Sequence, residues 1–452
     1  INQRFTFLPG SPDSLVGPDS TGLKINLVLK ADKPEGKIAF TNARIITMNG
    51  DKVIEKGTVL IEGNKIIGVG RVSVPKGAKI IDVSGKTIMP GLIDSHAHLG
   101  QFGSGLNPQK HWQYHANLAY GVTTTHDPSS STELTFSQAE MVKAGHMVGP
   151  RIFSTGTILY GADALFKADI NNLEDAKSAV YRTQAYGPFT VKSYNQPRRN
   201  QRQQVIKAAH DLKVGVLPEG GSTLYHNLTM VLDGHSSIEH NIPVVPLYND
   251  IIQLWGASQT SYTPTLIVNY GAMNGEYFWY QDSNVWEDKK LLNFTPRNII
   301  DARARHRTMV PISEYENGYI KVSKSAKKLA DAGVRVNLGA HGQLQGLGVH
   351  WELWMLSQGG MSNMQALKTA TTNGAMLLGM ESEIGSIEKG KLADLIILDK
   401  NPLDDIKNSN TVQWTMVNGR LYDANTLHEK GNYDKPKGTF FWEKDNAVLD
   451  FE

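Results

Sequence analysis

The stretch that decides the fold reads Thr87-Ile-Met-Pro-Gly-Leu-Ile-Asp94-Ser-His96-Ala-His98-Leu-Gly100. Apolar and small residues lead into the histidines, Pro90 disfavours a helix and a glycine follows, so the pattern predicts a short buried strand that ends in a loop. Because alternate residues of a strand point to one face, His96 and His98 would present both imidazoles on the same side. Two imidazoles so placed can bind one metal ion. A plain pair of polar residues at a strand tip explains the His-x-His pattern by itself equally well.

Outward from this stretch, predicted strands and helices alternate, which is typical of a parallel α/β fold. The strand candidates are residues 91–96, 121–127, 151–154, 190–194, 214–217, 237–240, 261–266 and 334–341. Helices are predicted between them, for example at 173–186, 199–212 and 313–332, and a closing helix at 362–379 with Ser362 as its N-cap. Eight βα units predict a (β/α)8 barrel, in which the active site lies at the C-terminal ends of the strands.

Two separated segments flank the predicted barrel of residues 90–385 and carry the alternation typical of β-strands. They are residues 37–89, with a hairpin turn at Asn49-Gly50, and residues 386–424. Residues 1–36 are broken into short pieces by proline and glycine and are expected to be an extension or linker. Residues 425–452 are expected to be a C-terminal tail.

Three motifs carry a resemblance to a known family: Pro90-Gly-Leu-Ile-Asp94-Ser-His96-Ala-His98, Gly121-Val-Thr-Thr-Thr125 and Gly385-Ser-Ile-Glu-Lys-Gly-Lys-Leu-Ala-Asp394-Leu-Ile-Ile-Leu. Together they resemble the metal-dependent amidohydrolase superfamily, in particular its prolidase-like and imidazolonepropionase-like branch, over most of the chain. The resemblance implies a (β/α)8 TIM barrel beside a small β-sandwich built from both flanking segments. The extension resembles the lead-in found where an amidohydrolase follows a β-propeller, so an N-terminal propeller from the same precursor is an expected partner.

The resemblance also implies metal ligands at the ends of three strands. His240 closes Ser236-Ser-Ile-Glu239-His240, which matches the sixth-strand ligand motif and would join His96 and His98. Lys192 ends the fourth strand, where many relatives carry a carbamylated lysine that bridges two metals. A lysine paired with a carboxylate is the alternative for Lys192.

The chain departs from the family at two positions. Leu217 stands where the fifth-strand histidine is expected, and Glu219, two residues on and on the same face, could replace that ligand or carry a proton; a plain turn residue is the alternative. His341 stands where the eighth strand normally supplies an aspartate that contacts the metal and acts as base. An imidazole can do either job near pH 7. We predict that His341 is a ligand and that Glu219 is the proton carrier.

Other polar residues have weaker claims. Asp127, at the end of the second strand, could orient a ligand histidine, although a solvent-facing role fits almost as well. His235 is expected to support the site from outside or to be structural, and His350 to be a packed surface or loop histidine. The long stretch 267–312 is rich in Tyr, Trp and Asn, and its aromatic residues would either wall a substrate pocket or pack in the core.

The composition narrows the class of protein to which the chain can belong. Of 452 residues, 40% are hydrophobic and 20% charged, which suits an enzyme-sized globular protein, and no apolar run approaches the roughly 20 residues of a membrane span. The 46 basic and 44 acidic residues leave a net charge of +2, which gives no case for nucleic acid. Without cysteine, any metal must use His, Asp, Glu or a modified Lys. Because the chain starts at Ile1, we expect a processed or excised chain. Separately, an extracytoplasmic location (periplasmic or secreted) and a homo-oligomer are expected.

The resulting prediction is a metal-dependent hydrolase that cleaves an amide or other C–N bond in a small molecule or short peptide. The resemblance implies a divalent ion, here expected to be Zn²⁺. Such an ion lowers the pKa of bound water to about 7 and polarises the carbonyl. The leucine at position 217 favours one tightly bound ion over two. A lactonase or ester hydrolase on the same centre is one alternative. A barrel that has lost catalysis and binds a ligand or partner is the other.

Overall fold

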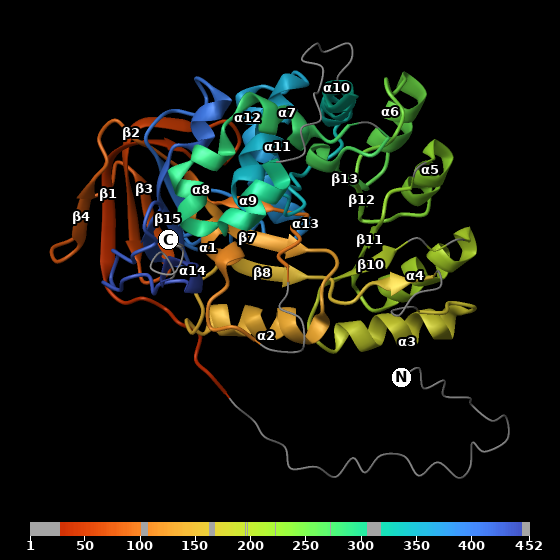
Figure 1. Ribbon diagram of the computed structural model, residues 1–452, viewed down its shortest axis with the longest axis horizontal. Coiled ribbons are helices and arrows are strands. Elements are labelled where there is room, and N and C mark those ends of the chain that lie inside the picture. The colour runs from red at the N-terminus through yellow and green to blue at the C-terminus, as the bar shows by residue number, and fades with distance from the viewer. Residues whose placement is uncertain are drawn as a thin grey trace, which may run out of the picture.

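The computed structural model describes residues 28–444, apart from 101–106, 162–167, 195, 197, 222, 272 and 305–317. Residues 1–27 and 445–452, which include most of the predicted extension and part of the tail, therefore lie outside the described residues, as does the start of the helix predicted at 313–332. Figure 1 shows an antiparallel-rich sheet at one end of the molecule and helices α3 to α6 at the other.

Short parallel strands form the barrel. They are β6 (Leu92–Asp94), β7 (Val122–Asp127), β8 (Arg151–Ser154), β9 (Leu159–Tyr160), β10 (Thr190–Tyr194), β11 (Gly215–Pro218), β12 (Ser237–Glu239) and β13 (Ser261–Thr263). Parallel pairing joins β6-β7-β8, β9-β10-β11 and β12-β13, and a parallel bridge between Glu219 and Glu239 links the last two groups. All the predicted strands up to the seventh are present, most of them shorter by one to three residues.

The predicted eighth strand is wrong as a regular strand. Residues 334–341 make a single isolated bridge, from Val336 to Tyr262, and otherwise run without ladder pairing. Backbone hydrogen bonds nevertheless close the barrel here, because Ser95 N donates to Leu338 O at 2.9 Å and His341 N donates to His96 O at 2.7 Å. The segment thus takes the place of a strand beside β6.

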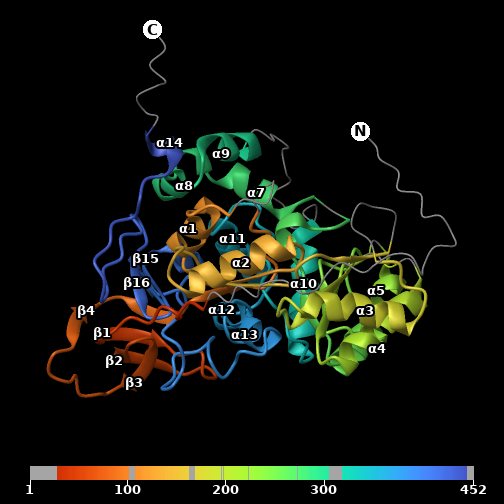
Figure 2. The same cartoon turned by 90° about the horizontal axis from the view of Figure 1, so that it is seen from below.

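Helices cover the outside of the barrel. They are α1 (Trp112–Ala119), α2 (Thr132–Lys143), α3 (Leu173–Gln184), α4 (Arg199–Asp211), α5 (Leu224–Leu232), α6 (Asn249–Gly256), α10 (Gly318–Asp331), α11 (Leu347–Gln358), α12 (Asn363–Thr369) and α13 (Thr372–Leu377). An insertion after β13 holds α7 (Gly275–Asp282), α8 (Lys289–Phe294) and α9 (Arg297–Ala304), and α14 (Phe441–Lys444) follows much later. Figure 2 shows the insertion helices on one face of the molecule and α12 and α13 toward the opposite face.

The single helix predicted at 362–379 is wrong, because the segment forms two helices. Ser362 caps α12 as expected, accepting a hydrogen bond from Gln365 N at 3.2 Å. The helix stops at Ala370, whose carbonyl accepts from Ile93 N of β6 at 2.8 Å, and Thr371 leaves the helical region with φ −136° and ψ −95°. A tertiary hydrogen bond to the barrel therefore replaces one that would have continued the helix.

The flanking segments meet in one eight-stranded sheet of order β16-β15-β14-β5-β1-β2-β3, with β4 also paired to β1. Its strands are β1 (Lys37–Ile46), β2 (Val53–Glu62), β3 (Lys65–Gly70), β4 (Lys79–Asp82), β5 (Thr87–Pro90), β14 (Leu395–Leu398), β15 (Val412–Val417) and β16 (Arg420–Asp423). Strand β5 lies at the junction, since it pairs with β1 on one side and with β14 on the other.

Gly91 marks the point where the chain passes from this sheet into the barrel. Strand β5 ends at Pro90 and β6 starts at Leu92, so one residue separates the two sheets. A Cβ at position 91 would lie 2.1 Å from Thr123 Oγ1 on β7, a distance that no side chain can occupy. The deciding stretch therefore ties both layers together, and it needs glycine for the close approach of the strands. Among the described residues, no helix is long and apolar enough to cross a membrane.

Candidate metal centre

The predicted site residues gather at one end of the barrel. His96 and His98 follow β6, Lys192 lies in β10, Glu219 follows β11, His240 follows β12, and His341 follows the segment that replaces strand eight. Because parallel strands present their C-terminal ends on the same side, residues far apart in the chain meet there.

Asp94 joins the first and last strands of the barrel at this end. The buried Oδ1 of Asp94 accepts from His96 N at 3.2 Å and from Ala340 N at 3.0 Å. Burial raises the pKa of Asp94 to about 6, although those two hydrogen bonds oppose the rise. The carboxyl thus holds the backbone of His96 beside the backbone that leads to His341.

Three imidazoles share a common centre, and a fourth, that of His98, lies beside them without a nitrogen in this group. One ring nitrogen from each of His96, His240 and His341 lies within 4.8 Å of the others. The ring of His98 lies 5.1 Å from that of His96 and 4.5 Å from that of His341, measured between centroids. The His96 side chain is fully buried, whereas that of His98 is 31% exposed, so the centre is open to solvent on the His98 side.

Each of these histidines has its Nδ1 atom held by a neighbouring oxygen. The partners are Glu239 Oε2 for His96 (2.5 Å), Asp127 Oδ1 for His98 (3.3 Å), Thr265 Oγ1 for His240 (2.7 Å) and Gln343 Oε1 for His341 (3.5 Å). A partner on Nδ1 fixes the orientation of the ring and leaves Nε2 for another ligand. The common arrangement indicates that the Nε2 atoms are the functional ones.

The electrostatics of the centre favour neutral imidazoles and a bound cation. Burial lowers the pKa of His96 well below its usual value, lowers that of His240, and lowers that of His341 to about 2. Neutral imidazole is the form that binds a metal. Within the described part of the chain, His96 Nε2 is buried and has no hydrogen-bond partner. A buried acceptor without a donor fits a bound cation, and so does the donor set of several imidazoles.

Glu219 bridges the fourth and sixth strands. Its Oε2 lies 2.8 Å from Lys192 Nζ, and its Oε1 lies 3.1 Å from His240 Nε2 and accepts from Tyr270 OH at 2.7 Å. Burial opposes ionisation of Glu219, but the charge of Lys192 and the contact with His240 outweigh it and set the pKa well below the usual range. Two ligand atoms on one tetrahedral Zn²⁺ lie roughly 3.3 Å apart. The spacing of Glu219 Oε1 and His240 Nε2 is therefore compatible with shared coordination.

The backbone at the centre adopts a conformation that non-glycine residues rarely use. His240, Thr265 and His341 have φ angles of 70°, 48° and 58°. Such left-handed residues cost free energy and cluster at functional sites. At His240 the change of direction also lets Glu239 and His240, which are consecutive residues, both reach the centre, where a regular strand would turn one of them away.

The remaining sequence predictions have mixed outcomes. Asp127 is buried against His98, so the solvent-facing alternative is wrong. His235 is buried and its Nδ1 contacts Met230 O at 3.0 Å, outside the centre. The prediction of His350 as a surface or loop residue is wrong: it is fully buried in α11. Leu217 is fully buried with no polar role.

The sequence interpretation missed three residues of the centre. They are Glu239, which lies within the His240 motif, Thr265 and Tyr270. Tyr270 stacks on His240, with centroids 4.2 Å apart, in addition to its hydrogen bond with Glu219. A buried acid next to a predicted ligand was the available signal for Glu239. The other two lie on irregular backbone, where periodicity predicts nothing.

The aromatic residues of the insertion mostly pack in the core. Trp279 and Tyr280 of α7 are 2% and 6% exposed and belong to the main hydrophobic cluster. Trp279 lies 5.1 Å from Trp354, between ring centroids. Of the two alternatives for this segment, core packing describes these two rings.

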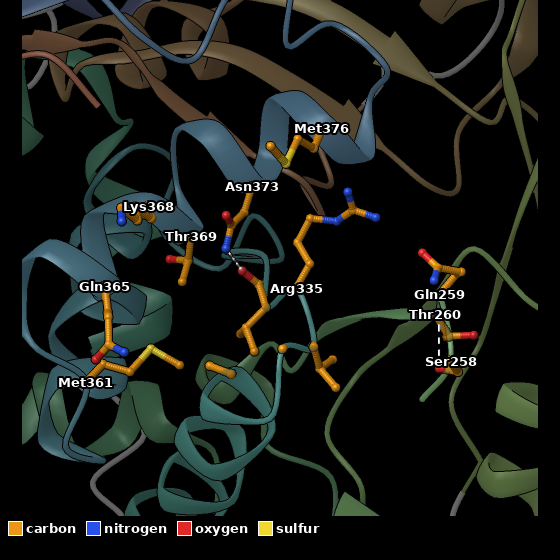
Figure 3. Close-up of a pocket in the computed structure, with 14 residues that line it drawn as sticks. Ser258, Gln259, Thr260, Arg335, Met361, Gln365, Lys368, Thr369, Asn373 and Met376 are labelled. Carbon is orange, nitrogen blue, oxygen red and sulfur yellow. Dashed lines mark hydrogen bonds between the residues drawn. The ribbon is translucent and has the colours of Figure 1, made fainter. Parts of the chain in front are cut away.

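A cavity of about 460 Å³ lies away from the centre, between the segment 333–336 and helices α12 and α13. Figure 3 shows Arg335 reaching into it, with Gln259 across the space and Met376 nearby. None of the predicted site residues lines this cavity, so the histidine centre remains the candidate active site.

Comparisons with known proteins agree with the geometry. The model of the amidohydrolase family matches residues 87–422. Ochratoxinase of Aspergillus niger is 24% identical over 429 residues, covering 86% of this chain and 87% of that protein. A 5-methylthioadenosine/S-adenosylhomocysteine deaminase of Bacillus cereus is 24% identical over 406 residues, covering 80% and 85%. Among solved structures, a Xaa-Pro dipeptidase with bound methionine has 25% identity and a TM-score of 0.65, covering 86% of this chain and 100% of that one. Molinate hydrolase has 18% identity and a TM-score of 0.67, covering 90% and 99%.

Proposed function

The chain belongs to the amidohydrolase family, and on that premise we propose that the histidine centre holds one Zn²⁺ ion for hydrolysis of a dipeptide-like amide. Family membership makes the protein a metal-dependent hydrolase of amide or related C–N bonds on a TIM barrel. The choice of metal, its number, the roles of individual residues and the substrate class are the proposal. The observation that carries it is the buried, unpartnered His96 Nε2 in a ring of imidazoles whose Nδ1 atoms are all held.

We assign His96, His98, His240 and His341 as the residues that hold the ion. When bound, such an ion supplies an activated water near pH 7 and polarises a carbonyl. The neutral ligand at position 341 leaves the centre with less charge compensation than an aspartate would. Leu217 removes one ligand of the second site found in two-metal relatives, which supports one tightly bound ion. Anomalous scattering should give one strong peak; two peaks about 3.5 to 4 Å apart would indicate a second metal, with Lys192 as a carbamylated bridge.

Glu219 is assigned as the proton carrier because of its position. Its Oε1 is beside His240 Nε2, at the mouth of the barrel, and Lys192 holds its other oxygen. Tyr270 OH donates to the same Oε1, which fixes the carboxylate toward the centre. Glu219 is ionised, so it would accept a proton on Oε1 as the nucleophile attacks and deliver it to the departing nitrogen, although its lowered pKa makes it a weak base.

A dipeptide-like amide is the proposed substrate class. The support is the likeness to a Xaa-Pro dipeptidase over 86% of this chain, together with a centre open to solvent beside His98. A panel of dipeptides, N-acyl amino acids and lactones, tested on the metal-loaded chain, would check this class. We expect kcat/KM for the amides to exceed kcat/KM for the lactones by at least about tenfold. Preference for lactones would assign the same centre to an ester hydrolase.

Metal analysis tests the centre itself. The purified chain should contain about one tightly held ion, and a chelator should remove activity that Zn²⁺ restores. A chain that holds no metal even after soaking with Zn²⁺ would contradict the proposal and favour a barrel that only binds a ligand or partner.

Three further features of the whole protein are also proposals. We infer that the eight-stranded sheet folds over its own core as a small sandwich, supported by its separate buried cluster, which includes Phe40, Ile88, Ile397 and Met416. An N-terminal β-propeller in the same polypeptide is inferred from the resemblance, and we further propose a homo-oligomer and an extracytoplasmic location. Light scattering of the purified chain would check the oligomer.

A further inference from the structure

Helix α7 of the insertion places a buried carboxylate close to the metal centre. Glu276 is 4% exposed, and its Oε1 accepts from Gln343 Nε2 at 2.9 Å. Its Oε2 makes no hydrogen bond of good geometry among the described residues, although Arg303 Nη1 lies 3.9 Å away and the Tyr280 hydroxyl interacts with the carboxylate. Burying a carboxylate with so few partners costs free energy.

Gln343 connects this carboxylate to His341. Its Nε2 faces Glu276, and its Oε1 lies 3.5 Å from His341 Nδ1. A carboxylate oxygen can only accept a hydrogen bond from an amide, so the NH₂ group of Gln343 must face Glu276. The carbonyl oxygen of Gln343 then faces His341 and can only accept from Nδ1–H. The chain of contacts selects the tautomer of His341 whose Nε2 carries the lone pair.

Two of the other ligand histidines follow a related scheme with fewer steps, whereas His240 Nδ1 contacts the hydroxyl of Thr265. His96 and His98 contact the carboxylates of Glu239 and Asp127 directly. His341 differs because its nearest oxygen is an amide, and the negative charge lies one residue farther away, on Glu276. The chain thus retains a carboxylate behind the ligand that replaced the usual aspartate.

We propose that Glu276 is a positioning residue that fixes the ring and tautomer of His341 through Gln343. The inference rests on the proposed role of His341 as a metal ligand. It assigns the insertion after β13 a part in building the centre, in addition to its packing. Partners of this kind that orient ligand histidines are worth 10–100-fold in metal affinity.

The test uses the full chain loaded with Co²⁺, whose visible spectrum reports ligand geometry. Glu276→Leu removes the acceptor, Gln343→Met removes the link while keeping the side-chain length, and Glu276→Gln keeps an oxygen that can accept from Gln343. Glu287→Leu is the matched control, because Glu287 is exposed in the same insertion. Affinity is measured by competition with a chelator, and the unfolding temperature of each metal-free chain is measured alongside.

Glu276→Leu and Gln343→Met should weaken Co²⁺ binding by roughly 10- to 100-fold and alter the spectrum. Glu276→Gln should stay within a few fold of the wild type, and Glu287→Leu should match it. If the wild type binds Co²⁺ normally and both Glu276→Leu and Gln343→Met leave the affinity and the spectrum unchanged, the positioning role of Glu276 is wrong and the metal centre still stands. A wild type that binds no metal would overturn the proposed metal centre and, with it, the positioning role of Glu276.

Discussion

Two regions of this molecule bury histidines and carboxylates side by side, and they differ in how completely these side chains are hydrogen-bonded. In α11, His350 has both ring nitrogens occupied, Nδ1 by Ser409 Oγ at 3.0 Å and Nε2 by Tyr120 O at 2.9 Å. Two residues on, Glu352 accepts from the backbone N–H groups of Leu266 and Ile267 at 2.7 and 3.0 Å. Every one of these polar atoms has a partner within the chain.

At the barrel mouth the same residue types are left incomplete. The Nε2 of His96 is buried without a partner among the described residues, and His240 and His341 have left-handed backbone. The contrast teaches that burial of a histidine does not by itself indicate function. A completed set of hydrogen bonds indicates structure. A held Nδ1 with a free Nε2 indicates a site for a cation only where other imidazoles converge on it, because His235, outside the centre, also has a buried Nε2 without a partner among the described residues.

The largest effect is expected from His96→Ala. Removing the buried nitrogen should lower the affinity for Zn²⁺ by at least about 100-fold, the upper limit for losing a supporting partner alone, while the barrel still folds. Metal content by elemental analysis and folding by circular dichroism check this. Full metal retention in the variant would remove His96 from the ligand set and with it the basis of the comparison.

Glu219→Gln should separate chemistry from metal binding. The amide keeps the shape of the side chain but is a poor proton acceptor, so turnover should fall roughly 10²-fold or more. Metal content should stay near that of the wild type, because His96, His98, His240 and His341 remain. The measurement is kcat on the best amide substrate, with the metal assayed on the same sample. Normal turnover here, together with a metal-loaded but inactive His341→Asn, would make His341 the base.

His350→Leu should affect stability and not metal. The change leaves Tyr120 O without its buried partner and Ser409 Oγ with Trp354 Nε1, which costs on the order of 1–3 kcal/mol of unfolding free energy. Chemical denaturation of the metal-free chain measures this loss, and the affinity for Zn²⁺ should be unchanged. A loss of metal in His350→Leu would show that the two regions are coupled, against the comparison.

The smallest effect is a pH dependence of stability from the structural histidines. Burial lowers the pKa of His350 to about 3 and that of His235 to about 4, below the usual value of 6.5. A base with a lowered pKa stabilises the fold above 6.5, and this contribution is lost as pH falls from 6.5 toward those values. Each histidine should contribute up to about 1.4 kcal/mol per pH unit. Denaturation at pH 7.5 and pH 5 should therefore show a smaller difference for His350→Leu than for the wild type.

Local pattern was enough to predict much of the fold. Alternation and apolar runs located the strands that became β6 to β8 and β10 to β13, although not the two-residue β9, because strand period and turn residues are properties of neighbouring positions. The i and i+2 spacing of His96 and His98 and the Ser362 cap are likewise local. The family motifs added the sixth-strand histidine and the two positions where this chain departs from its relatives.

Only the tertiary structure decided which polar residues meet. Glu239 reaches His96 across 143 positions of sequence, and Glu276 reaches Gln343 across 67. The helix break at Ala370 depends on Ile93, and the burial of His350 depends on Ser409 and Tyr120. No periodicity encodes such pairs, because each depends on how separate strands and loops close into one barrel. Local sequence sets the secondary-structure elements and the types of ligand residue. Long-range packing decides whether a buried histidine has both ring nitrogens hydrogen-bonded or keeps one for a cation.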